Sequence, residues 1–63
     1  MSDHALERIC GEVNSKCATL RAASRLLPGL SARESEEMLV LMTEEVLRLA
    51  KSLEEHRREA SRQ

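Results

Sequence analysis

The chain is short, rich in helix-forming residues and nearly neutral, and these properties exclude several classes of protein. It has 63 residues, ten basic and eleven acidic side chains, and no Phe, Tyr or Trp. A core of this size supplies no more than about 3–5 kcal/mol by itself. The interleaved charges argue against a nucleic-acid surface or a membrane anchor. The longest apolar run, residues 38–42, cannot span a bilayer, and no signal-peptide pattern is present, so we expect a cytoplasmic protein.

A first helix is expected over about residues 3–27. Ser2 or Asp3 can cap its first backbone N–H groups with a side-chain oxygen. Pro28 and Gly29 then end the helix, because proline disfavours helical geometry in the residue before it and glycine permits a turn.

A second helix is expected over about residues 32–59, after a loop at residues 28–31. Its start is marked by Ser31 and Glu34, which match the capping box, in which each side chain bonds the backbone N–H of the other residue. Residues 1–63 should therefore form one helical-hairpin domain.

Apolar residues recur along both helices in steps of three and four, the heptad pattern of helices that pack together. The predicted core residues are Leu6, Cys10, Val13, Cys17, Leu20 and Leu27 in the first helix, and Leu39, Met42, Val46, Leu49 and Leu53 in the second. Further apolar residues flank each stripe, which makes it wide enough for a helix that meets two neighbours. We therefore predict an all-α fold in which an antiparallel two-helix hairpin dimerises into a four-helix bundle.

Charged residues of the outer faces are spaced to pair within each helix. The expected i,i+4 pairs are Glu12–Lys16, Glu44–Arg48 and Glu54–Arg58. Each is worth only a few tenths of a kcal/mol, so they support the helices without defining a site.

The two cysteines, Cys10 and Cys17, lie seven residues apart on the first helix, or about 10 Å, which is too far for a disulfide within the chain. A zinc site would need a second pair of ligands, and the sequence has none at suitable spacing. Two interpretations remain: small buried apolar residues, or a disulfide between two chains under oxidising conditions.

Residues able to carry catalysis are few. His4 lies in the first turn of the first helix, and His56 occupies a heptad position near the end of the second. A single hairpin offers no concave pocket to hold a catalytic group, so we expect no enzymatic activity, no cofactor and no metal. A phosphotransferase that uses either histidine is a third hypothesis, behind the two given below.

Gly11 is unusual because a glycine inside a helix costs roughly 1 kcal/mol relative to alanine. Either a neighbouring helix packs closely there, or the position once held another residue, or a partner's backbone approaches it.

Residues 10–21, CGEVNSKCATLR, resemble the phosphoacceptor helix of sensor histidine kinases. In that family the dimerisation and histidine-phosphotransfer domain reads His-Glu-Ile/Leu-Asn/Arg-Asn-Pro-Leu, followed by small residues and an apolar-Arg pair. The matching positions are Glu12, Val13, Asn14, Leu20 and Arg21. Residues 44–53 are similar to the second helix of the family, so the resemblance extends over most of the chain.

The departures from this family concern its chemistry. Gly11 stands where the phosphorylated histidine should be, and Lys16 replaces the proline that bends the family's helix. The resemblance therefore implies the scaffold of a phosphotransfer domain without its activity: a dimeric interaction module of two-component signalling that binds a response-regulator receiver domain or a histidine kinase. The partner-binding residues that it implies are Gly11, Glu12, Ser15 and Thr19. The alternative is a homodimeric helical scaffold unrelated to phosphotransfer.

Overall fold

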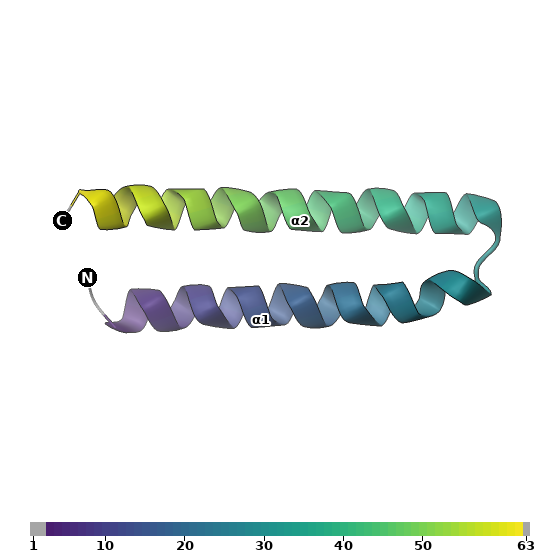
Figure 1. Cartoon of the computed structure of the whole chain (residues 1–63), viewed down its shortest axis with the longest axis horizontal. Coiled ribbons are helices and arrows are strands. Elements are labelled where there is room, and N and C mark those ends of the chain that lie inside the picture. Colours follow the sequence, from purple (N-terminus) through teal and green to yellow (C-terminus); the bar gives the residue numbers. More distant parts are fainter. Residues whose placement is uncertain (1–2, 63) are drawn as a thin grey trace.

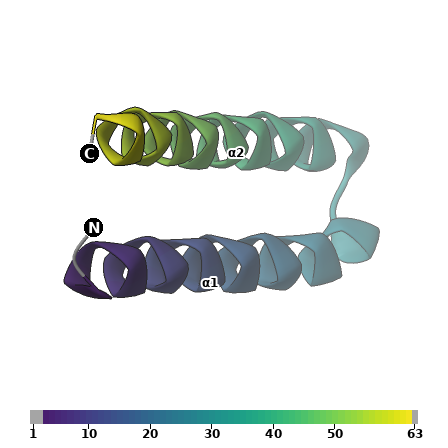
Figure 2. The ribbon, with the colours of Figure 1, turned by 60° about the vertical axis from the view of Figure 1, so that its left-hand side comes forward.

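The structure, a computed structural model, describes residues 3–62, and all regular secondary structure in that range is helical. Helix α1 (Asp3–Leu26) and helix α2 (Ala32–Ser61) are joined by a short 3-10 turn, η1 (Leu27–Gly29). The two long helices run antiparallel and side by side, and the turn lies at one end of the molecule (Figure 1). They remain side by side when the molecule is turned (Figure 2). The predicted all-α class and the two helices are confirmed.

The turn between the helices is defined by local backbone and side-chain bonds. Leu30 N donates to Leu27 O at 3.1 Å, which closes η1 around Pro28. The Ser31 hydroxyl then accepts from Glu34 N at 3.2 Å, and Ser31 N donates to a Glu34 carboxylate oxygen at 2.9 Å. The predicted capping box is therefore present, and these bonds to Ser31 hold the pKa of Glu34 below its usual value.

The observed helix limits differ slightly from the expected ones. Helix α1 ends at Leu26, one residue early, because Leu27 enters the 3-10 turn. Helix α2 continues to Ser61, two residues beyond its expected end. Ser2, one of the two expected caps of the first helix, lies outside the described residues.

The hairpin is a single layer of two helices and has no interior. None of residues 4–62 is buried, and the Cα atoms extend 49 × 16 × 8 Å. The radius of gyration is 15.0 Å, against about 11 Å for a compact domain of this length. The side chains that face the other helix are only half-buried, and eight large apolar side chains are between 42% and 63% exposed.

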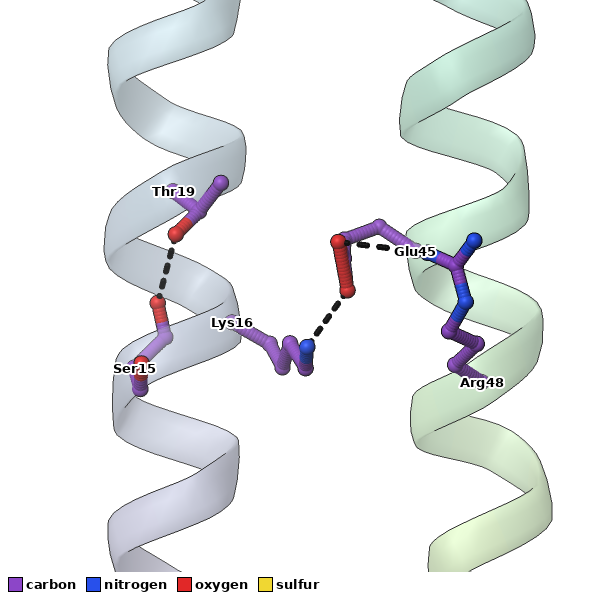
Figure 3. A network of polar contacts seen from close by, with 5 residues as sticks. All are labelled: Ser15, Lys16, Thr19, Glu45 and Arg48. Atoms are coloured by element: carbon purple, nitrogen blue, oxygen red, sulfur yellow. Dashed lines mark hydrogen bonds and ion pairs between the residues drawn. The ribbon is translucent and has the colours of Figure 1, made fainter.

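Within residues 3–62, one ion pair joins the two helices. Lys16 Nζ of α1 lies 2.5 Å from Glu45 Oε1 of α2, and Arg48 contacts the other carboxylate oxygen of Glu45 at 3.4 Å (Figure 3). Lys16 therefore pairs with Glu45 rather than with Glu12, and Arg48 pairs with Glu45 rather than with Glu44. The hydrogen bond from Lys16 is the main reason that the pKa of Glu45 is lowered. In the register of the hairpin residue 16 lies near the level of residue 45, and Ser35 Oγ donates to Leu27 O at 3.5 Å near the turn.

Candidate protein-interaction surfaces

An exposed, uncharged surface extends over both helices on one side of the hairpin. We call it the apolar face. It comprises the exposed residues Leu6 and Cys10 of α1 and Leu39, Val46 and Leu53 of α2, with the half-buried Val13 and Cys17 at its inner edge. Its four largest exposed side chains, the three leucines and Val46, are between 42% and 51% exposed. Ile9, Cys10, Val13, Asn14 and Leu53 line a shallow groove of about 360 Å³ on it, so the contributions of α1 and α2 join at this point.

Helix α2 carries two neighbouring heptad rows, and only one of them faces α1. The half-buried row comprises Ser35, Met38, Met42, Glu45, Leu49, Ser52 and His56. The next row comprises Leu39, Thr43, Val46, Ala50 and Leu53, and all of its side chains are exposed. Each row follows steps of three and four, so each can pack against a helix. A helix with two such rows is typical of a four-helix bundle, in which each helix has two neighbours.

The predicted core residues divide between these two environments. Half-buried beside the other helix are Val13, Cys17, Leu20, Leu27, Met42 and Leu49. Exposed on the apolar face are Leu6, Cys10, Leu39, Val46 and Leu53. In the single hairpin the Cys10 thiol is free and exposed, whereas Cys17 is half-buried. A dimer core made from all of these residues stays a prediction.

The predicted partner-binding residues lie together on the side of α1 that points away from the apolar face. We call Gly11, Glu12, Ser15 and Thr19 the outer side of α1; Glu12 is half-buried and the others are exposed. The Thr19 hydroxyl donates to Ser15 O at 3.1 Å, within the same helix (Figure 3). A Cβ atom built on Gly11 would meet nothing within 4 Å. Close packing inside the hairpin therefore does not explain this glycine.

A second apolar depression, near the turn, was not anticipated from the sequence. Its volume is about 200 Å³, and its lining residues are Thr19, Leu20, Ala23, Met38, Leu41, Met42 and Glu45. Leu41 is 61% exposed there. Because Thr19 belongs both to this depression and to the outer side of α1, the two form one continuous surface. The sequence feature that could have indicated this depression is Leu41, an apolar residue outside the heptad stripe of α2.

The most polar depression lies at the end of the hairpin opposite the turn. Its volume is about 220 Å³, and its lining residues are Arg8, Ile9, Glu12, Ser52, Glu55, His56 and Glu59. Within residues 3–62, His56 forms no hydrogen bond or ion pair, so no base or acid is aligned with its ring. No group of three or more His, Cys, Asp or Glu side chains in that range is arranged to hold a metal ion.

Comparisons with protein-family models, with curated proteins and with solved structures gave no match to this chain. The resemblance to histidine-kinase dimerisation domains therefore rests on the residues alone. Neither described helix is both long enough and apolar enough to cross a membrane.

Proposed function

We propose that this chain is a non-catalytic interaction module that associates with a second copy of itself through the apolar face and binds a further protein on the outer side of α1. The observation that carries the proposal is the combination of an uncharged face over both helices with the lack of any buried residue among residues 4–62. A chain that buries nothing by itself has little to offset the conformational entropy of ordering two helices, about 1–2 kcal/mol per residue for the backbone. Folding and association are then one event.

The exposed area supports a second copy as the first occupant of the apolar face. The chain exposes 5086 Å², whereas a folded monomer of 7.1 kDa exposes about 4,100 Å². The excess is about 1,000 Å², and a stable dimer of standard size buries about 800 Å² on each partner. One hairpin therefore has the surplus surface that one such interface covers.

The resemblance to kinase dimerisation domains supports a receiver domain, or a histidine kinase, as the further partner. The outer side of α1 stays accessible when the apolar face is covered, because the two surfaces lie on different sides of the same helix. Gly11 has no side chain that could accept a phosphoryl group. The module would then act by occupying a receiver domain or by exchanging subunits with a kinase, with its charged outer faces selecting among partners.

Association is tested by a molar mass from light scattering together with helicity from circular dichroism, over a dilution series. We expect a dimer, and we expect the helical signal to fall as the dimer dissociates. A monomer that stays fully helical at micromolar concentration would refute the proposal.

The further partner is tested by titrating a purified receiver domain into the dimer. We expect binding, and we expect Thr19→Arg to abolish it, because the larger charged side chain covers the surface that joins Ser15 to Leu41. Leu47→Arg is the matched control, since Leu47 is exposed on the other helix outside that surface. Both variants should keep the dimer mass. A dimer that binds no receiver domain would instead favour the unrelated helical scaffold.

A further inference from the structure

The exposed row of α2 is bounded by opposite charges. Glu36 precedes it and Arg57 follows it, in the same steps of three and four that place Leu39, Thr43, Val46, Ala50 and Leu53 on one side of the helix. Glu36, Leu39, Val40, Thr43 and Glu44 line one continuous shallow depression, so Glu36 adjoins the apolar residues on the surface. The row thus begins with an acid, continues without charge and ends with a base. Its midpoint falls between Val46 and Leu47.

Helix α1 repeats this arrangement at the edge of the apolar face. Its row comprises Glu7, Cys10, Asn14, Cys17 and Arg21, again in steps of three and four. The midpoint of this row is Asn14. The contacts of Lys16 with Glu45 and of Ser35 with Leu27 O place Asn14 within about one residue of the level of Leu47. Both rows therefore have their midpoints at the same level of the molecule.

We infer that the second copy docks on the apolar face in inverted orientation, related by a twofold axis perpendicular to the helices at the level of Asn14 and Val46. This inference rests on the proposed dimerisation and specifies its geometry. Helix α1 then packs antiparallel on α1 of the second copy, and α2 on α2. A homodimer interface uses the same patch on both copies. Each row therefore packs against the same row of the second copy running in the opposite direction, and its two ends must carry complementary charges.

The charges at the ends of both rows satisfy this condition. The twofold rotation about the axis at the level of Asn14 and Val46 places Glu7 beside Arg21 of the second copy. It likewise places Glu36 beside Arg57 of the second copy. Arg57 already holds Glu54 through Nε at 3.0 Å and Nη2 at 2.5 Å, and Nη1 makes no hydrogen bond within residues 3–62. A guanidinium has five N–H donors, so Arg57 can hold both carboxylates. No like charges meet along either row.

The other twofold arrangement, with its axis along the helices, fits the charges less well. It places α1 against α2 of the second copy, with the same levels that the helices have within one hairpin. Glu7 then lies level with Glu54 of the second copy, a like charge, and Arg21 lies level with Val40, which offers no carboxylate. Glu36 comes level with Arg25 of the second copy, so this arrangement has one opposite and one like pair, whereas inversion gives two opposite pairs and no like pair. Charge complementarity selects orientation more than it adds affinity, so it is the property that distinguishes these two arrangements.

The inverted orientation also predicts which cysteines of the two copies lie level with each other. Cys10 and Cys17 lie on either side of Asn14 at nearly equal distance along α1, so Cys10 of one copy comes level with Cys17 of the other. In the alternative arrangement each cysteine lies level with its own counterpart.

Single cysteines placed in a Cys10→Ser/Cys17→Ser background test the orientation with a short bis-maleimide cross-linker. Val46→Cys lies within one residue of the proposed axis, so its two copies should cross-link readily. Leu39→Cys is the matched control on the same row. Its two copies would be separated along the helix axis by about 22 Å, beyond the reach of the reagent. We expect at least a tenfold higher yield at position 46; equal yields, a higher yield at position 39 or none at either would overturn the inference.

The natural cysteines give a second readout with the same reagent. The wild-type dimer should cross-link, and Cys10→Ser and Cys17→Ser should each lower the yield, because Cys10 comes level with Cys17 of the other copy whereas two copies of Cys10 or of Cys17 are about 12 Å or 9 Å apart along the helix axis. An unchanged yield in either single variant, or no product in the wild type, would count against the inverted orientation. The molar mass of each protein is measured first: a monomeric parent refutes the proposed dimerisation, whereas a dimer with the wrong cross-links refutes only this geometry.

Discussion

Replacing Val46 with aspartate places a carboxylate at the centre of the apolar face. Val46 is 48% exposed in the hairpin, and the second copy would cover the rest of its side chain. Full burial of a valine side chain is worth about 1.5–3 kcal/mol, so the half that remains contributes about 1 kcal/mol per copy. Burying a carboxylate without a partner adds a penalty of several kcal/mol per ion. The dimer should weaken by at least about 4 kcal/mol, or about a thousandfold in Kd.

The matched control is Leu47→Asp. Leu47 is 63% exposed and lies outside the apolar face. Replacing it with aspartate lowers helix propensity at least as much as Val46→Asp does, because leucine favours the helix more than valine. Light scattering and circular dichroism at micromolar concentration should show loss of the dimer and of the helical signal for Val46→Asp, and a folded dimer for Leu47→Asp. A Val46→Asp protein that remains dimeric and fully helical would refute the assignment of the apolar face.

Three further predictions concern single residues of the hairpin. Ser31→Ala removes one bond of the capping box and should lower the free energy of unfolding by about 1 kcal/mol per chain in urea titrations, whereas an unchanged value would mean that the cap contributes nothing. Gly11→Ala should raise it by about 1 kcal/mol, because the added Cβ meets nothing within 4 Å; a loss of stability would indicate that the second copy approaches Gly11 closely. The pKa of Glu45 is lowered in the folded state by Lys16, so its contribution is present above the pKa of the unfolded chain and is lost as the pH falls below about 4. The thermal midpoint should therefore drop less between pH 7 and pH 3 in Glu45→Gln than in the wild type, and an equal drop would refute this role of the ion pair.

The sequence by itself determined the elements and the points where they end. Pro28 and Gly29 interrupt the helical pattern, and Ser31 with Glu34 restarts it, because these effects act within a few residues of the chain. The heptad steps also identified the side chains of the apolar face, since a period of three and four residues places them on one side of a helix whatever lies next to it.

Only the tertiary structure decided which heptad row of α2 faces α1. The row that does so includes Ser35, Glu45 and Ser52, and a search for apolar periodicity passes over polar residues. The apolar row beside it, with Leu39 and Val46, remains exposed. Lys16 reaches Glu45 instead of its own helix because the antiparallel register brings that carboxylate within 2.5 Å, and no local spacing encodes a contact between residues so far apart in the chain. Local propensity thus determines where helices form, whereas the side that each helix presents depends on the surface it meets.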